Sequence, residues 1–256
     1  MRRAPLVLAS ALALPGGLLA GQAPGPVTVH PDGSITGLRP AFRAATGLTA
    51  APDRFRLDFG LPRQPPVERW LESGLLPICH TRWEHAGIRY TQSVLLTRLA
   101  EGDPTPAGQP APDGVLMVRL AGACAASEYT EATAAFAVEL QGSPVELVLR
   151  EGLAFDARAG PDALMAMVDI TAGGVASTNG PRLSFRGSMP PGTSGSMTIK
   201  LPLGTLPHSA DLDRLRDLDF DEEARRVKRF WLERARAGAT NSLPVRFPAK
   251  DVTPGD

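Results

Sequence analysis

The sequence has no excess of charge of either sign. Its 27 Lys and Arg residues balance 27 Asp and Glu residues, which gives a formal net charge of +0. Proteins that bind nucleic acid or an anionic membrane surface usually carry a basic patch, and the balanced charge gives no such footprint. Apolar runs of the ~20 residues that cross a bilayer are also missing. We therefore expect no nucleic-acid partner and no membrane span.

The familiar motifs of catalysis and cofactor binding are missing as well. There is no Walker A loop, no G-x-G-x-x-G between a strand and a helix, and no H-E-x-x-H. The segment closest to a nucleophile elbow, residues 192–196, reads G-T-S-G-S and lacks the final glycine of G-x-S-x-G. The sequence therefore predicts no cofactor and offers no catalytic residue by motif.

Cysteine occurs only twice, at Cys79 and Cys124. Neither has a second cysteine at metal-binding spacing, so no metal site is expected. In an oxidising compartment the two cysteines can form a disulfide that stabilises the fold by about 2–4 kcal/mol. Alternatively, they are two small, buried side chains on separate strands. The sequence leaves both alternatives open.

Glycine and proline, by contrast, are abundant. The 256 residues include 26 Gly and 25 Pro, about a fifth of the chain, against about 12% in an average protein. Without a G-x-y repeat, this excess indicates many turns between short elements and argues against long helical bundles and coiled coils. The hydrophobic share of 43% is enough for a sizeable core.

The N-terminus is typical of a secretory signal peptide. Two arginines follow Met1, an apolar stretch covers residues 4–14, and small residues lie near a cleavage site at 20–23. This apolar stretch is too short for a membrane anchor and is followed by proline and glycine. We therefore expect residues 1–23 to be removed and the protein to be exported to the periplasm or the cell exterior.

Period-two alternation of apolar and polar residues recurs between turn signals in the next part of the chain. The clearest pattern is a hairpin with strands at Leu76–Trp83 and Ile88–Leu96 and a turn at Glu84–Gly87. Further strands are expected at Arg54–Phe59, Val115–Leu120, Ala134–Leu140, Val145–Leu149, Leu164–Ile170, Leu183–Arg186 and Ser196–Leu201. No amphipathic helix separates these strands, so the sequence predicts a mainly β fold with antiparallel sheets packed as a sandwich over residues 24–206.

The pattern changes after Pro207. Leu212, Leu215 and Leu218 are spaced by three, and a stronger helix is expected over Asp221–Ala237, with Gly238 as its stop. Its acidic residues come first and its basic residues later, which suits the helix dipole. Ala224, Val227, Trp231 and Ala235 form an apolar stripe. We expect linker helices over 207–238 that dock on the sandwich or on a neighbouring domain, followed by a proline-containing tail over 239–256.

Aromatic residues are scarce, at 5% of the chain, which limits the candidates for stacking on sugar rings. These candidates are Trp70, Trp83, Tyr90 and Tyr129, although aromatic residues on strands more often belong to the core. His80 and Glu84 share a strand face and form the only local histidine–carboxylate pair. The acidic run Asp217–Glu223 is explained by capping at a helix start.

Two segments resemble the N-terminal β-sandwich of bacterial six-hairpin glycosidases. The hairpin TRWEHAGIRYTQ at 81–92 resembles their T-x-W-E-x-x-G-V-x-Y pattern. The later segments IKLPL at 199–203 and LDFD at 218–221, followed by Phe230-Trp231 and Gly238, resemble the end of that sandwich and its linker helix. The resemblance covers residues 55–248 in patches.

This resemblance implies a galactose-mutarotase-like, or supersandwich-like, fold that supports a downstream α/α toroid. The catalytic carboxylates of such proteins belong to the toroid, so no residue of this sequence is expected to be catalytic. The implied function is a non-catalytic, exported module that gives structural support or contacts carbohydrate, with a carbohydrate or the toroid as partner. Two alternatives stay open: a standalone carbohydrate-binding protein, or a mutarotase-like sugar epimerase using His80 and Glu84.

Overall fold

The protein is represented by a computed structural model. It describes residues 6–7, 27–30, 33–39, 53–58, 68–74, 76–100, 113–124, 130–140, 143–144, 146–156, 164–171, 175–180, 182–203 and 209–239. The expected signal peptide lies outside the described residues except for Leu6 and Val7, and so do the tail beyond Ala239 and the candidate Tyr129. These predictions remain untested.

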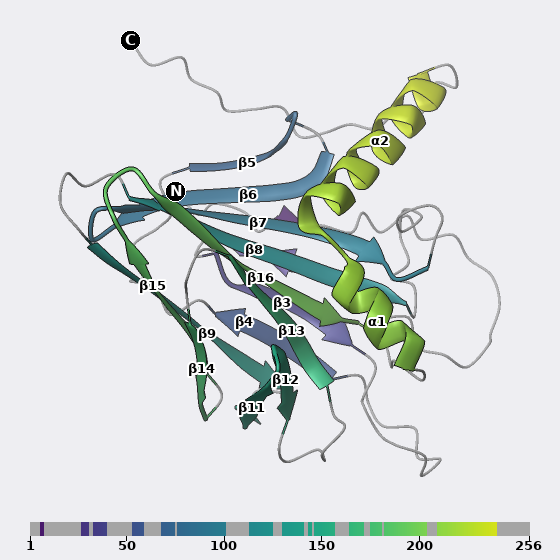
Figure 1. The fold of residues 1–256 in the computed structure, drawn as a ribbon. Coiled ribbons are helices and arrows are strands. Elements are labelled where there is room, and N and C mark those ends of the chain that lie inside the picture. Colours follow the sequence, from purple (N-terminus) through teal and green to yellow (C-terminus); the bar gives the residue numbers. More distant parts are fainter. Residues whose placement is uncertain are drawn as a thin grey trace.

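The described chain is mainly β, as the sequence predicts, and forms two antiparallel sheets (Figure 1). In spatial order, sheet A contains β1 (Leu6–Val7), β2 (Thr28–Val29), β3 (Ile35–Arg39), β4 (Asp53–Asp58), β9 (Thr130–Leu140), β15 (Arg182–Met189) and β14 (Val175–Asn179), with β10 (Ser143–Pro144) paired to β9. Sheet B contains β11 (Leu147–Arg150), β12 (Leu153–Asp156), β13 (Leu164–Thr171), β16 (Ser194–Pro202), β8 (Gly114–Cys124), β7 (Ile88–Arg98), β6 (Leu76–His85) and β5 (Glu68–Glu72).

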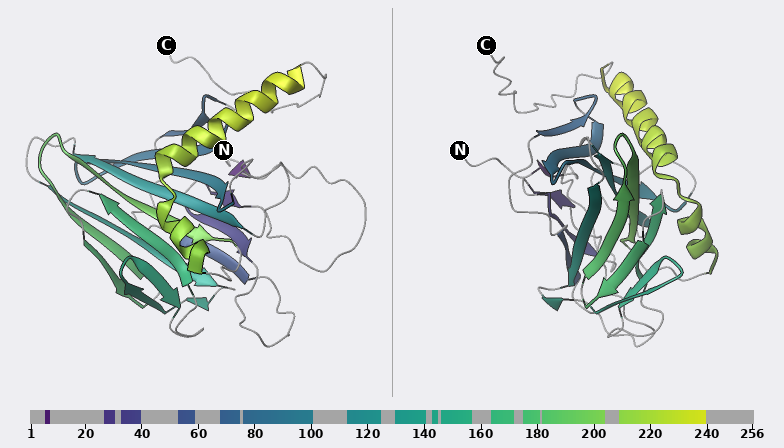
Figure 2. Two further views of the ribbon diagram at one scale, coloured as in Figure 1. Left: turned by 45° about the vertical axis from the view of Figure 1, so that its right-hand side comes forward. Right: turned by 60° about the vertical axis from the view of Figure 1, so that its left-hand side comes forward.

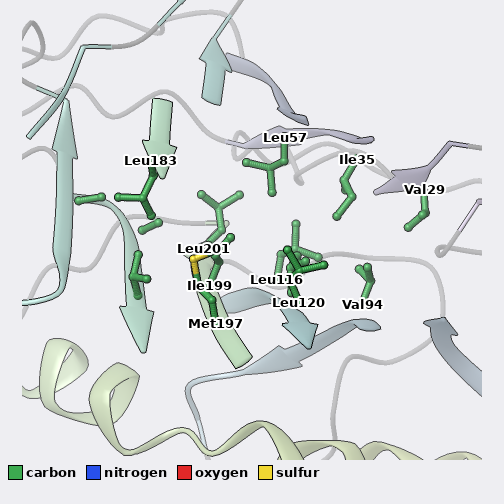
Figure 3. Close-up of a cluster of buried hydrophobic side chains, with 14 of the residues drawn as sticks. Val29, Ile35, Leu57, Val94, Leu116, Leu120, Leu183, Met197, Ile199 and Leu201 are labelled. Atoms are coloured by element: carbon green, nitrogen blue, oxygen red, sulfur yellow. The ribbon is translucent and has the colours of Figure 1, made fainter. Parts of the chain in front are cut away.

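The core between the two sheets confirms the predicted sandwich. Alternate residues along each strand point inward, because successive side chains of a strand lie on opposite faces. Ile35 and Leu57 from sheet A meet Val94, Leu116 and other apolar side chains from sheet B, as Figure 3 shows. These four side chains are at most 1% exposed. Burial of such side chains contributes about 1.5–3 kcal/mol each, so this layer is the main source of stability.

The β6–β7 hairpin is tighter than predicted. Its strands pair up to His85 and Ile88, which leaves a two-residue turn of Ala86 and Gly87. The φ angles of these two residues are 50° and 75°. A two-residue turn with positive φ at both positions matches the right-handed twist of the flanking strands. The expected turn at Glu84–Gly87 is therefore shortened, and His85 lies in β6 rather than at the tip.

The two helices pack on the outer face of sheet B, the face turned away from sheet A (Figure 2). They are α1 (Ser209–Asp217) and α2 (Phe220–Ala239). Asp219 caps α2, because its carboxylate accepts hydrogen bonds of 2.9 Å from the backbone N–H groups of Asp221 and Glu222. The predicted start of α2 is correct to one residue, whereas Gly238 does not stop the helix.

The apolar stripe of α2 docks on the sandwich, the first of the two expected possibilities. Val227 is buried against sheet B, and Ala224 and Trp231 pack around the same cluster. Ala235, the last member of the predicted stripe, is exposed. The contact therefore ends near Trp231. Within the described residues, neither helix is long and apolar enough to cross a membrane.

The two cysteines do not form the disulfide that the sequence left open. Cys79 and Cys124 are buried thiols outside any disulfide, on β6 and β8 with β7 between them. Their pairing partners on β7 are Val94 and Ile88, six residues apart, which is about 20 Å along a strand. A disulfide needs Cα atoms within about 7 Å. Burial raises the pKa of the Cys79 thiol, so little of it is thiolate and it should react slowly.

Candidate functional site

The outer face of sheet B divides into two halves of different character. In Figure 1 both helices lie across the right-hand ends of β7, β8 and β16 and leave the left-hand parts of these strands uncovered. We call these parts the covered half and the open half. The strand register shows which residues stand in each row across the sheet, because paired residues lie side by side on the same face.

The covered half is apolar. One of its rows runs through residues on five strands: Leu95, Met117, Lys200, Met167 and Leu153. All five are buried, and four of them form a cluster with helix residues.

Lys200 is the single charged member of this row and is 1% exposed. Its ammonium group donates hydrogen bonds of 3.0 and 2.8 Å to the backbone carbonyls of Leu215 and Arg216 in the last turn of α1. It also forms an ion pair of 2.7 Å with Asp169. A cation at a helix C-terminus satisfies carbonyls that lack helical partners. Lys200 therefore anchors α1 to the sheet.

A boundary row of mostly polar residues separates the two halves. It crosses the sheet through residues paired in register: Trp70, His80, Ser93, Arg119, Thr198 and Asp169. Arg119 faces α2, where its guanidinium forms an ion pair of 2.6 Å with Asp221 and lies 4.3 Å from the ring centroid of Phe220. The boundary row thus marks where the helices end on the sheet.

His80 is the centre of a hydrogen-bond chain in the boundary row. Its Nε2 lies 3.1 Å from Oε2 of Glu72, and its Nδ1 lies 2.9 Å from the Ser93 hydroxyl. An ionised carboxylate can only accept, so Nε2 carries the proton and Nδ1 accepts from Ser93. Burial is the largest influence on His80 and lowers its pKa below the ordinary value. The imidazole is therefore neutral near pH 7.

Glu72 extends this chain to the helix. Its other oxygen, Oε1, accepts a hydrogen bond of 2.9 Å from Lys228 of α2. This bond is the largest influence on the Glu72 carboxyl and lowers its pKa. Both nitrogens of His80 and both oxygens of Glu72 are thus engaged. These hydrogen bonds connect the edge strand β5 to α2, and they leave neither the imidazole of His80 nor the carboxylate of Glu72 free to act on a ligand.

The open half contains a shallow hollow of about 190 Å³. It lies over β6, β7, β8 and β16 and is lined by Arg82, Arg89, Thr91, Ala121, Gly122, Ala123 and Ser194. The alternation of the strands places these side chains on the outer face, apart from Gly122, which contributes backbone. The floor of the hollow over β8 is formed by Ala121, Gly122 and Ala123, which carry nothing larger than a methyl group, so a flat ligand can approach this strand closely.

Each arginine of the hollow forms an ion pair with a nearby glutamate. Arg82 donates from Nη1 to Glu68 at 3.1 Å, and Arg89 donates from Nε to Glu84 at 2.9 Å. All four side chains are 41–58% exposed, so these pairs stabilise the fold by about 0–1 kcal/mol each. The two glutamates are not part of the lining. The charged residues that border the hollow are thus two arginines, each paired with a glutamate outside the lining.

The structure separates the three predicted sugar-stacking residues. Tyr90 is 3% exposed in the sandwich core, and Trp83 packs against the same core and stacks on Tyr90 at a centroid distance of 5.8 Å. Trp70 lies on the outer face beside the hollow, where it stacks on His80 at 5.1 Å and contacts the Arg82 guanidinium at 4.9 Å. Trp70 is thus the one candidate of these three on the outer face.

The predicted pair of His80 and Glu84 does not form. The two residues share the outer face, but His80 bonds to Glu72 and Glu84 bonds to Arg89. Neither lines the hollow. They are four positions apart along β6, which is about 13 Å, so the two groups cannot act on the same small ligand. Among the described residues, no group of three or more His, Cys, Asp and Glu side chains could hold a metal ion.

Sequence reasoning missed the residues of the hollow. The alternation within the hairpin could have placed Arg82 and Arg89 on the outer face. Ser194 lies about a hundred residues further along the chain and is brought to the hollow because β16 pairs with β8.

Comparison with protein-family models and with curated proteins finds no match for this sequence.

Proposed function

We propose that this protein is an exported β-sandwich module of a carbohydrate-active protein, and that it contacts carbohydrate through the open half of sheet B. The observation that supports this most strongly is the hollow beside Trp70. It combines a flat floor, hydrogen-bonding side chains and an adjacent aromatic ring. Sugar-binding sites need such convergent polar groups together with apolar surface for the sugar ring.

The module is proposed to be non-catalytic. The resemblance to six-hairpin glycosidases assigns the catalytic carboxylates to an α/α toroid, and the order of sandwich followed by helices agrees with that resemblance. Its partner would be a carbohydrate together with a toroid domain. A reading frame for such a toroid directly downstream in the genome would support a split or truncated glycosidase.

A standalone carbohydrate-binding protein is the second candidate. It is favoured by the way that α1 and α2 bury their apolar residues on sheet B of the same chain. The apolar faces of the helices are therefore buried without contact to another domain. The epimerase alternative loses its basis, because His80 and Glu84 have separate partners.

Tryptophan fluorescence tests the carbohydrate contact. The chain contains Trp70, Trp83 and Trp231, and titration with a panel of polysaccharides should change the emission of Trp70 only. Trp70→Phe should abolish the response. Trp83→Phe should keep it, because Trp83 packs against the sandwich core and not on the outer face. An unchanged signal and no calorimetric heat across the panel would argue for a purely structural module.

A glycosidase assay tests the absence of catalysis. The purified chain should not hydrolyse glycosides in the same panel. Turnover that disappears when one carboxylate is replaced would overturn the non-catalytic assignment.

A further inference from the structure

We propose that the hollow is selective for acidic carbohydrate, namely sugar units that carry a carboxylate, as uronic acids do. This inference rests on the proposed carbohydrate contact and adds the class of sugar. It depends on the charge of the lining, on the donors that the two arginines still have available, and on the shape of the floor.

The charged side chains of the lining are basic, and their glutamate partners lie outside it. Arg82 and Arg89 both border the hollow, and no carboxylate does. The register places Arg82 opposite Thr91 and Glu84 opposite Arg89, so the two arginines stand diagonally across β6 and β7. Diagonal neighbours of this kind lie about 7–8 Å apart at Cα, and long side chains can reach a common ligand from both sides.

Each arginine keeps N–H donors for a ligand on its terminal nitrogens, whereas Nε of Arg82 is buried without a partner. A guanidinium has five N–H donors in a planar fork that fits a carboxylate with two parallel hydrogen bonds. Arg89 bonds to Glu84 through Nε, and Arg82 bonds to Glu68 through Nη1. Because both ion pairs are exposed and weak, a ligand carboxylate can bind to the remaining donors or exchange with these glutamates at little cost.

The rest of the lining fits the hydroxyl-bearing part of a sugar. Thr91 and Ser194 lie at the hollow, and each offers one hydroxyl donor and two acceptor lone pairs. Neither makes a side-chain hydrogen bond to another residue that the structure describes. Ala121 and Ala123 between them leave room for a ring above the sheet.

Calorimetric titration of the purified full chain distinguishes the alternatives. The probes are a galacturonate oligosaccharide, a neutral galactose oligosaccharide of the same length, and succinate as a carboxylate without a sugar. We expect the acidic oligosaccharide to bind at least tenfold more tightly than either of the others. Raising NaCl from about 0.05 to 0.5 M should weaken this binding, because exposed charges are screened.

Three variants locate the site. Arg89→Gln and Arg82→Gln should each weaken binding of the acidic oligosaccharide about tenfold. Arg225→Gln is the matched control, since Arg225 is 70% exposed on α2 and lies outside the hollow; its affinity should be unchanged. Equal losses in all three variants would indicate a general charge effect and would overturn the assignment to the hollow.

The remaining outcomes separate this inference from the proposed function. Equal affinity for the acidic and neutral oligosaccharides would overturn the selectivity and leave the carbohydrate contact intact. Equal affinity for succinate and the acidic oligosaccharide would reduce the hollow to an anion site and overturn the inference. Binding of no sugar at all would overturn both proposals.

Discussion

The covered and open halves of sheet B are built from the same strands but have opposite properties. On β7, Leu95 is 0% exposed beneath the helices, whereas Thr91, four residues earlier on the same face, borders the hollow. On β8, Met117 and Ala121 show the same relation. Backbone pairing is continuous across both halves. The side chains of each row therefore decide which half binds the helices and which faces solvent.

This comparison shows how one sheet face can serve two purposes. Apolar rows bind the helix stripe because burial of apolar surface is favourable at about 25 cal/mol per Å². Polar rows repel it, because groups such as Arg82 and Arg89 would lose hydration under a helix. The boundary row lies between these two environments: Arg119, and Glu72, which is joined to the row by its bond to His80, contact α2 while remaining partly exposed.

The largest expected effect comes from truncating the covered half. Leu95→Ala should lower the free energy of unfolding by about 2–5 kcal/mol, because it removes buried methyl groups and leaves a cavity. Thr91→Ala, at the open position on the same strand, should change it by less than about 0.5 kcal/mol. Urea denaturation of both variants measures the difference. Similar losses at the two positions would show that the halves do not differ as described.

The next effect concerns the two lysines that bind helices to sheet B. Lys200→Met keeps the size of the side chain but removes the donor to the α1 carbonyls, and it should cost about 1–3 kcal/mol. Lys228→Met removes a half-exposed ion pair to Glu72 and should cost about 0–1 kcal/mol. Thermal unfolding can rank the two variants. If Lys228→Met proved the more damaging, α2 rather than α1 would be the critical contact.

Much of this arrangement could be predicted from the sequence where the signal is local. The hairpin strands followed from alternation around Gly87, and α2 followed from its apolar stripe and charge order. The helix end was missed because a glycine within a helix costs only about 1 kcal/mol, too little to stop α2 at Gly238.

The candidate site was predictable only in part, because it depends on strand order. Alternation assigns Tyr90 to the same face as Ile88 and Val94, so its burial could be anticipated. The approach of Ser194 to Arg89 depends on the sheet order β16–β8–β7, and pairing between distant segments leaves no periodic signal. The sequence could not decide on the disulfide for the same reason, since only the strand register shows that Cys79 and Cys124 are far apart.

The boundary row should make stability depend on pH. In the folded state, the pKa of His80 lies below its ordinary value of about 6.5. The unfolded chain therefore binds more protons as pH falls through this range, and stability decreases from about pH 7 downwards. The lowered pKa of Glu72 has the same sign and extends the decrease below about pH 4.5.

Replacement of each group should remove its part of the pH profile. His80→Gln should flatten the stability curve between about pH 7 and 5 and leave the acidic limb, whereas Glu72→Gln should flatten the limb below about pH 4.5. Urea midpoints measured at half-unit pH intervals test both. A wild-type curve that rises as pH falls from 7 to 5 would show that the Glu72 carboxylate, rather than burial, dominates His80.

The smallest expected effect on stability comes from the open half, and it matters for the ligand experiment. Arg82→Gln and Arg89→Gln each remove one exposed ion pair, so each should change the free energy of unfolding by about 0–1 kcal/mol. Their loss of affinity for acidic carbohydrate should nevertheless be about tenfold. A residue that anchors the fold would lose stability and binding together. A residue that serves a ligand loses binding alone, and thermal unfolding of both variants without sugar, set beside the calorimetry, decides which description holds for the open half.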